Sequence, residues 1–371
     1  MILRSLGTRS FRNLADATTS FHPLANIVVG ANGQGKTNLL EAIYFLGTTK
    51  SFRTTRLAHL PARGLATVYV EGEVEEPSGV KRRQSVGLQL APERRREILL
   101  NRQKVPLHRY LGLLPLFAYS SARLAIVKGG PDERRRFLDR GIASVDPGYL
   151  GALTRYARAL RQRNALLAQI AGGSRRGADL EAWDRELVEA ALPVVTARAA
   201  YTAGLAATRE RIVREHGYHV EGLRLVYRPS GFEEDVSLEA GLAALRGVRR
   251  REAGAGHTLA GPHRDVLDIL LGDEPATEIL SSGEVKMTVL FLKLAKVELY
   301  REKTGGVPLF LLDDIDAELD LAVIERLLSY LIGTIQLFTT SPKDEFFDRF
   351  QLGSHRRFAV SGGEIRVVAE R

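Results

Sequence analysis

The chain has 371 residues, enough for one large domain or for two to three domains of ordinary size. It is 44% hydrophobic and 26% charged, close to the average of soluble globular proteins, which excludes wholesale disorder. No apolar run approaches the roughly 18 residues of a transmembrane helix, so a membrane protein is not indicated. The net charge of +9 suits a polyanionic partner, although a basic surface that serves only solubility is also compatible with it.

Cysteine content and the first residues bear on location. The chain contains no cysteine, which excludes disulfides, cysteine nucleophiles and thiolate metal sites. The first 21 residues, MILRSLGTRSFRNLADATTSF, lack a secretory apolar core and a small-residue cleavage site. We therefore expect a cytoplasmic protein.

In chain order, the pattern predicts two α/β segments separated by a helical lobe. Residues 1–118 alternate short β-rich runs such as NIVVG and ATVYVEGEV with turns and one clear helix. Residues 119–220 are rich in Ala, Leu, Arg and Glu at helical spacing, and Pro193 is expected to start a new helix or to kink a long one. Residues 221–371 return to strands, of which VPLFLLDD and TIQLFTT are typical of a buried parallel sheet.

The stretch VVGANGQGKTN matches the phosphate-loop pattern GxxxxGKT, with a strand expected before it and an amphipathic helix after it. Glycines let successive backbone N–H groups point inward, and the helix N-terminus adds partial positive charge where phosphates bind. Lys36 is expected to neutralise the β and γ phosphates and Thr37 to hold Mg²⁺. The predicted nucleotide-binding residues are Gly30, Ala31, Asn32, Gly33, Gln34, Gly35, Lys36, Thr37 and Asn38.

Two further motifs follow in the last third of the chain. In VPLFLLDDIDAELD an apolar strand is followed by Asp313, expected to support Mg²⁺ mostly through water, and Asp314, expected to orient or deprotonate an attacking water. In LSSGEVKMTVLFLKLAKVELY, Ser281, Ser282 and Gly283 precede a helix and form a second phosphate-binding surface. Taken alone, the first motif is also compatible with an acidic turn, and the second is more often an ordinary serine N-cap.

The order of the three motifs is that of ABC-type ATPases. In that class the signature stretch of one subunit caps the ATP that the phosphate loop of another subunit holds. The fold class expected from this order is therefore an α/β, ABC/SMC-type P-loop ATPase head, formed by residues 1–118 and 221–371, with an inserted helical lobe at 119–220. The signature residues Ser281, Ser282 and Gly283 would act in trans, together with Lys36 of the other copy.

Longer stretches resemble one family. FRNL (11–14), GANGQGKTNLLEAIYFL (30–46), SFRT (51–54), VKGGPDERRRFLD (127–139), LAGPHRD (259–265), LKLA (292–295) and DDIDAELD (313–320) are similar to the RecF family of bacterial recombination mediators, relatives of the SMC-type ATPases. The matches run along the whole chain in the family's order. From the residues alone, PDERRRFLD is expected to form a capped helix with Arg134, Arg135 and Arg136 as a basic face, and AGPHRD to place His263 and Arg264 on a turn.

The resemblance implies an ATP-dependent DNA-binding protein that recognises single-stranded gaps and their junctions with duplex. It implies action with RecO and RecR in loading RecA, in gap repair, replication-fork maintenance and SOS induction. It also implies a weak, DNA-stimulated ATPase that uses ATP and Mg²⁺ to time homodimerisation and release, with no membrane partner. As a hypothesis, DNA contacts fall on the basic clusters Arg82, Arg83, Arg94, Arg95, Arg96, Arg249, Arg250 and Arg251, each of which is also compatible with a solvated face.

The sequence departs from the family pattern at two places. Glu284, Val285 and Lys286 replace the glutamine-rich end of the signature, and an acid there is expected to weaken or retune capping. At 121–123, Ser, Ala and Arg stand where the family more often has a proline and acids. This puts in doubt a water- or Mg²⁺-orienting role at those positions.

Two other classes remain as alternatives. An ABC transporter ATPase subunit would bind a membrane permease and not DNA, and the helical insertion and basic charge disfavour it. An SMC-like DNA-tethering ATPase would need a coiled coil hundreds of residues long, which an insertion of about a hundred residues cannot supply.

Overall fold

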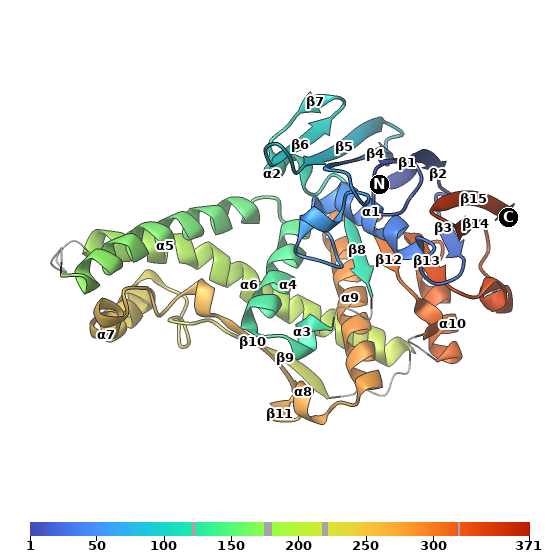
Figure 1. Ribbon diagram of the computed structural model, residues 1–371. Coiled ribbons are helices and arrows are strands. Elements are labelled where there is room, and N and C mark those ends of the chain that lie inside the picture. Colours follow the sequence, from blue (N-terminus) through green and yellow to red (C-terminus); the bar gives the residue numbers. More distant parts are fainter. Residues whose placement is uncertain (121–123, 174–179, 217–221, 318–319) are drawn as a thin grey trace. The chain divides into compact units, whose positions relative to one another are not determined.

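The computed structural model describes residues 1–120, 124–173, 180–216, 222–317 and 320–371 (Figure 1). It divides into two compact units, of which the first joins Met1–Arg123 to Val289–Arg371 and the second is Leu124–Thr288. Two chain ends that enclose an insertion agree with the expectation, but the second boundary lies at residue 288 and not at 220. The altered stretch at 121–123 lies outside the described residues.

The first unit contains an antiparallel sheet of six strands. From edge to edge these are β2 (Ala17–Ser20), β1 (Ile2–Arg9), β4 (Thr67–Glu75), β5 (Lys81–Gln89), β6 (Arg95–Leu100) and β7 (Gln103–Lys104). Alternation places Val68, Val70, Gly72 and Val74 of β4 in the core, while the alternate residues are more exposed. The predicted run ATVYVEGEV is therefore a half-buried strand.

A second sheet of six strands carries the parallel core of the first unit. Its order is β15 (Glu364–Glu370), β14 (His355–Ser361), β3 (Ala25–Val29), β13 (Gln336–Ser341), β12 (Leu309–Leu312) and β8 (Leu116–Tyr119). All of these pairings are parallel except that of β14 with β15. Every residue of β3, β12 and β13 is buried, which confirms the prediction of buried parallel strands.

Helix α1 (Lys36–Thr48) packs between the two sheets. Its buried Leu39, Ile43 and Phe45 share one core cluster with Val70 of the antiparallel sheet and Phe338 of the parallel sheet. Helix α9 (Ser282–Thr304) reaches the parallel sheet through Tyr300, whose ring centroid lies 6.0 Å from that of Phe117 in β8. The remaining short elements of this unit are η1 (Leu57–His59), α2 (Leu107–Tyr110), η5 (Ile315–Ala317), α10 (Leu321–Leu331) and η6 (Asp344–Arg349).

The second unit combines helices with a small sheet. Its helices are α3 (Ala125–Lys128), α4 (Pro131–Val145), α5 (Tyr149–Ala171), α6 (Leu180–His216), α7 (Leu238–Ala255), η4 (Pro262–Arg264) and α8 (Ala276–Ile279). Strands β9 (Leu223–Arg228), β10 (Val266–Leu271) and β11 (Glu274–Pro275) form an antiparallel sheet of their own. Because β9 and β10 pair with each other and not with the strands of the first unit, residues 221–288 belong with the helices.

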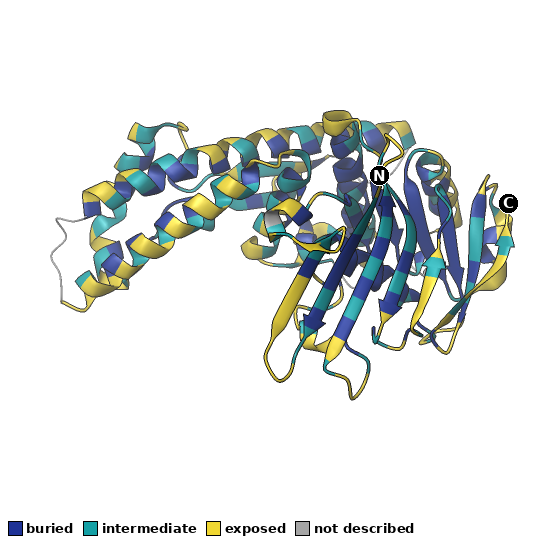
Figure 2. Cartoon of the chain, turned by 90° about the horizontal axis from the view of Figure 1, so that it is seen from above, coloured by how far each residue is buried: buried dark blue, intermediate teal, exposed yellow. Residues whose placement is uncertain are grey.

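Helix α6 continues through Pro193, so this proline does not start a new helix. In Figure 2 the helices of this unit alternate buried and exposed patches along their length, as amphipathic helices do. Among the described residues, no helix combines the length and the apolar composition needed to cross a membrane.

Candidate nucleotide-binding site

The loop at residues 30–35 links buried strand β3 to helix α1, which confirms the strand–loop–helix context expected of a phosphate loop. Gly30, Gly33 and Gly35 have φ values of +148°, +81° and +123°, a region that side chains rarely adopt. A Cβ atom on Gly30 would lie 2.3 Å from the Val360 carbonyl oxygen, whereas one on Gly33 would meet nothing within 4 Å. The loop is therefore packed on one side and open on another.

Lys36 is the first residue of α1, and it is 4% exposed. Its Nζ donates hydrogen bonds to the carbonyl oxygens of Gly30 (2.7 Å) and Ala31 (3.2 Å). The ammonium group thus lies over the loop at the N-terminus of the helix, where the helix dipole and the loop N–H groups also favour an anion.

Thr37 and Asp313 meet although 276 residues separate them, since the Thr37 hydroxyl donates to Asp313 Oδ1 at 2.9 Å. Thr340 at the end of β13 donates to the same carboxylate at 3.0 Å. Because β3, β12 and β13 are parallel, their carboxyl ends lie at one edge of the sheet and bring these groups together. The phosphate-loop segment and the acidic strand end therefore lie together although they are far apart in the sequence.

Burial raises the pKa of the Asp313 carboxyl to about 6, with the neighbouring Asp314 as the second cause, while hydrogen bonds from Thr37 and Thr340 oppose the rise. A hydroxyl and a carboxylate at this distance are oxygen ligands of the kind that Mg²⁺ accepts, and a bound cation would favour the ionised carboxylate. The residues present therefore fit a magnesium ion.

Asp314 follows with φ +47°, a left-handed conformation, and its backbone N–H donates to the Thr340 hydroxyl at 2.7 Å. The Thr37 hydroxyl bonds to Asp313, whereas the Thr340 hydroxyl lies near both carboxylates, 3.0 Å from Asp313 Oδ1 and 3.5 Å from Asp314 Oδ1. Asp314 is less buried than Asp313. Of the acidic residues farther along the motif, Glu318 lies outside the described residues.

A buried carboxylate that the sequence analysis did not single out lies in the helix that follows the loop. Glu41 in α1 is fully buried and accepts two hydrogen bonds from Arg12, at 2.9 and 3.0 Å. Ser51 donates to the same carboxylate, and Arg53 lies 3.8 Å from it. The family stretches FRNL and SFRT therefore meet on α1; the available signal was an acid within an otherwise apolar helical run, NLLEAIYFL.

The signature residues Ser281, Ser282 and Gly283 are exposed at the start of α9. The backbone N–H of Ser281 donates to Glu284 at 2.8 Å, and the backbone N–H of Glu284 donates to the Ser281 hydroxyl oxygen at 3.3 Å. These reciprocal bonds form a capping box, and they lower the pKa of the Glu284 carboxyl. In this structure Glu284 thus serves its own helix, a local role that its position in the signature did not suggest.

The apolar side chains along one stripe of α9 are buried, since Val285, Val289, Leu292 and Leu299 are at most 4% exposed. The signature was expected in the ATPase head, which is the first unit. Residues 281–288 fall instead within the second unit. The physical reason is that this segment directly follows strands β10 and β11 of the small sheet and helix α8, which belong to the second unit.

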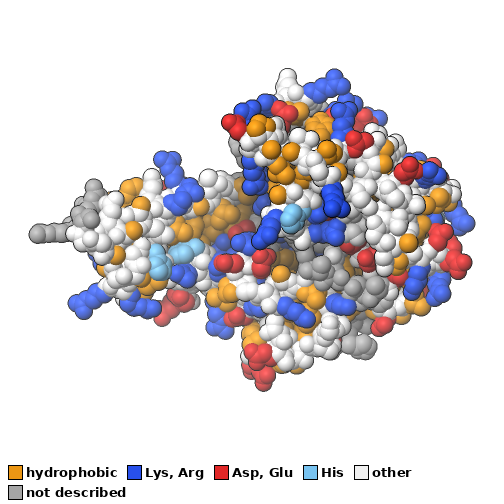
Figure 3. Space-filling view, viewed as in Figure 1, with side chains coloured by type: hydrophobic (Ala, Val, Ile, Leu, Met, Phe, Trp, Pro, Cys, Tyr) orange, Lys and Arg blue, Asp and Glu red, His pale blue; other side chains and the backbone are white. Residues whose placement is uncertain are grey.

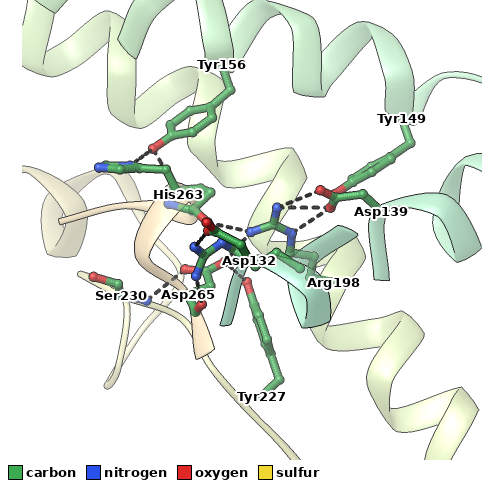
Figure 4. Close-up of polar contacts among 11 residues, drawn as sticks. Asp132, Asp139, Tyr149, Tyr156, Arg198, Tyr227, Ser230, His263 and Asp265 are labelled. Atoms are coloured by element: carbon green, nitrogen blue, oxygen red, sulfur yellow. Dashed lines mark hydrogen bonds and ion pairs between the residues drawn. The ribbon is translucent and has the colours of Figure 1, made fainter. Parts of the chain in front are cut away.

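The other two family stretches meet inside the second unit (Figure 4). Asp265 of LAGPHRD is fully buried and accepts hydrogen bonds from Arg198 (2.8 Å), from Tyr227 and from the Ser230 backbone (2.9 Å). Arg198 also forms an ion pair with Asp139 of PDERRRFLD, at 2.9 Å. These charges are paired and hydrogen-bonded, which is the condition for burying them.

The expected basic face at 134–136 is wrong for two of its three arginines. Arg134 donates to the carbonyl oxygens of Ile126, Val127 and Leu267, at 3.0 to 3.2 Å. Arg135 donates to the Asp265 carbonyl oxygen at 2.6 Å. Only Arg136 is exposed, so the stretch mainly binds α4 to neighbouring backbone.

His263 does not project freely from its turn. Its Nε2 lies 3.0 Å from the Thr258 carbonyl oxygen, so it donates there, and Nδ1 then accepts from the Tyr156 hydroxyl at 2.6 Å. Burial lowers the pKa of the His263 imidazole, as do the charges of Arg264 and Arg135, while Thr258 and Asp265 oppose the shift. The geometry and this pKa shift both favour a neutral ring.

We expect the free energy of unfolding to decrease more steeply in the wild type than in His263→Gln as the pH is lowered. Below the usual histidine pKa of about 6.5, His263 is protonated in the unfolded chain but stays neutral in the folded protein, where its pKa is lower. Protonation therefore stabilises the unfolded state, and the stability present above about pH 6.5 is lost as the pH falls toward the folded pKa. Thermal unfolding between pH 7.5 and 5.5 measures this, with His257→Gln as the exposed control. Parallel pH profiles for wild type and His263→Gln would contradict it.

Several of the arginines expected to contact DNA carry ion pairs. Arg82 lies 2.5 Å from Glu76, Arg83 lies 3.7 Å from Glu71, and Arg95 lies 2.7 Å from Glu93. Figure 3 shows the same interspersion of basic and acidic side chains over the visible face. Such exposed pairs are weak and can be exchanged for contacts with phosphate.

The other candidate arginines differ in burial. Arg249 pairs at 2.5 Å with Asp184, which also binds the fully buried Arg163. Arg96 donates to the Thr49 hydroxyl at 3.3 Å and is exposed, as are Arg94, Arg250 and Arg251. Arg249 therefore belongs to an internal ion cluster and is a poorer candidate than its two neighbours.

The phosphate loop on a parallel sheet, the acidic strand end and the two-sheet core define an α/β ATPase head of the ABC and SMC type. The family model "RecF/RecN/SMC N terminal domain" matches residues 2–357. The chain is 40% identical to the DNA replication and repair protein RecF of an Anaeromyxobacter species, over 98% of this chain and 99% of that protein. The chain belongs to the RecF family of DNA replication and repair proteins.

Other relatives agree with this assignment. The RecF protein of Geobacter sulfurreducens is 34% identical over 99% of this chain and 100% of its own length. A solved structure of the recombination mediator protein RecF with ATP, in the RecFOR pathway, is 28% identical with a TM-score of 0.89, covering 99% of this chain and 98% of that chain. An Smc head bound to part of ScpA, 15% identical with a TM-score of 0.55 over 99% and 97% of the two chains, shares the fold.

Proposed function

We propose that this protein is an ATP-dependent DNA-binding protein of recombinational gap repair. The observation that carries the proposal is the contact of Thr37 with Asp313 beneath a glycine loop that begins helix α1. This arrangement supports binding of a nucleotide with Mg²⁺, and the similar RecF structure determined with ATP supports ATP as that nucleotide. Residues 30–38 would surround its phosphates, in a cytoplasmic protein without a membrane partner.

Each residue of the site has a proposed task. Lys36 would exchange its two hydrogen bonds to carbonyl oxygens for contacts with the β and γ phosphates. Thr37 and Asp313 would hold Mg²⁺, which supplies positive charge to the phosphates. Asp314 lies beside this pair, and its carboxylate would orient or deprotonate the attacking water. Hydrolysis by such a site would be weak and would time the release of DNA.

The signature residues support a shared site between two copies of the chain. Ser281, Ser282 and Gly283 are exposed at the N-terminus of the long helix α9, where hydroxyl and N–H groups can meet phosphate. We propose that ATP joins two chains head to head, with Lys36 of one copy and Ser281 of the other at each nucleotide. Light scattering with and without ATP and Mg²⁺ measures the change in mass.

The DNA partner is proposed to be a gap or a single-strand/double-strand junction, in work with RecR, and with RecO and RecA downstream. The similarity to RecF of the RecFOR pathway supports this assignment, as does the net charge of +9. The exposed Arg94, Arg250 and Arg251 are the best-placed candidates for phosphate contacts. Support for replication and for the SOS response would follow from RecA loading.

The experiment that tests the function compares binding to gapped and to continuous duplex DNA, with ATP, with ADP and without nucleotide. We expect tighter binding to the gapped DNA with ATP, and a log–log salt slope near about −5 for some six phosphate contacts. Equal affinity under all three nucleotide conditions, or a slope near zero, would reject an ATP-dependent DNA-binding protein.

A further inference from the structure

The outer edge of the phosphate loop is hydrogen-bonded to two other segments of the chain, at Asn13 and at residues 362–363. The backbone N–H groups of Gly363 and Gly362, in the turn between β14 and β15, donate to the carbonyl oxygen (2.9 Å) and to Oε1 (2.6 Å) of Gln34. Asn13 Nδ2 donates to the carbonyl oxygens of Gly33 (3.1 Å) and Gln34 (3.3 Å). Both carbonyls at the tip of the loop thus have partners outside the loop.

The two fastening segments also hold each other. The backbone N–H of Ala15 donates to the Gly363 carbonyl oxygen at 3.0 Å. Gly363 has φ +86°, and a Cβ there would lie 1.8 Å from the Asn13 carbonyl oxygen, closer than any real contact. The chain at 13–15, the turn at 362–363 and the loop therefore form one close layer in which Gly363 has no room for a side chain.

This fastening determines which way the loop N–H groups point. In a planar trans peptide the carbonyl and the following N–H point in opposite directions. Because the carbonyls of Gly33 and Gln34 are held outward, the N–H groups of Gln34 and Gly35 point to the other side of the loop. The Gln34 N–H accordingly lies 3.4 Å from the Ala31 carbonyl oxygen across the loop.

We propose that Asn13 and Gly363 are positioning elements of the nucleotide site, which preset the phosphate loop before ATP arrives. The proposal rests on the proposed function, in that the loop must bind ATP. A glycine-rich loop without these contacts would lose conformational freedom on binding, and affinity would decrease accordingly. Asn13 extends the layer further, because its Oδ1 accepts from Asn38 at 2.6 Å, and Asn38 accepts from Arg53 at 2.6 Å.

Adjacent glycines provide a matched pair of variants. Gly362 and Gly363 both have positive φ, +56° and +86°, so alanine strains the backbone at either position. A Cβ on Gly362 meets nothing within 4 Å, whereas one on Gly363 displaces Asn13. In titrations with a fluorescent ATP analogue we expect about a tenfold loss of affinity for Gly363→Ala, the equivalent of two ordinary hydrogen bonds, and a loss within about threefold for Gly362→Ala.

Asn13→Ala gives a second route, since Asn13 is exposed and its removal leaves the turn in place. We expect a similar loss of affinity, and a double variant with Gly363→Ala that is less than additive because both act through the same loop. If Gly363→Ala does not fold, the Asn13→Ala titration decides alone. A wild type that fails to bind ATP would overturn the proposed function itself, whereas a wild type that binds ATP while Asn13→Ala binds equally well would overturn only the positioning role.

Discussion

Lys36→Met is expected to lose ATP binding by about a hundredfold or more, and with it the ATP-dependent binding to gapped DNA. The Lys36 ammonium lies at the loop, within 2.7 Å of the Gly30 carbonyl oxygen, and charge-assisted hydrogen bonds are worth about 1.5–3 kcal/mol each. Methionine keeps the length of the side chain and removes its charge. Titration with a fluorescent ATP analogue measures the first effect, and gapped-DNA binding with ATP measures the second.

Lys303→Met is the matched control, because Lys303 is exposed near the end of α9 and far along the chain from the loop. It should bind ATP and DNA as the wild type does. Lys36→Met with unchanged ATP affinity would show that the loop does not hold phosphates. Lost ATP affinity with unchanged, still ATP-dependent DNA binding would instead separate the DNA activity from this site.

Asp314→Asn is expected to accumulate as an ATP-bound dimer, with hydrolysis reduced by about 10²–10⁴-fold. The amide cannot take a proton from water, yet asparagine tolerates the left-handed backbone at φ +47°. The hydrogen bond from the 314 backbone N–H to Thr340 is unaffected by the change, so nucleotide binding should persist. Light scattering and phosphate release on the same samples measure the two effects.

Asp320→Asn serves as the control, since Asp320 is exposed before α10 and its side chain makes no capping hydrogen bond. It should hydrolyse ATP and dissociate as the wild type does. An Asp314→Asn protein that binds ATP normally but remains monomeric would show that the site is not shared between two chains. Normal hydrolysis by that variant would remove Asp314 from the reaction.

Local sequence was sufficient for much of the site because its parts are short-range. The glycine spacing, the lysine at the helix start and the apolar strands before the loop and before Asp313 are written in consecutive residues, and their structures follow from backbone sterics and hydrophobic burial. The sequence predicted the fold class but not the order of the strands. That β3 pairs with both β13 and β14 is known only from the structure.

Misplaced expectations involve residues whose role depends on distant partners. Arg134 and Arg135 read as a basic face from their spacing, but carbonyl groups of β10 and the turn before it draw them inward. The sequence pattern of residues 221–288 resembles further strands of the head. Strands β9 and β10 instead pair with each other, and the boundary between the two units lies at residue 288. The charge of a side chain and the pattern of a strand do not determine which backbone segment the side chain or the strand will contact in the folded protein.

The sequence by itself therefore determined the kind of protein, namely an ATPase head with a phosphate loop, an acidic strand end and an inserted lobe. Only the tertiary structure decided how the loop is held, through Asn13 and Gly363 at its edge, and which residues pair with the buried Glu41 of α1. The physical reason is that a motif follows from local backbone preference, whereas hydrogen bonds between separate segments, such as the one from Gly363 to Gln34, exist only once the sheets have formed.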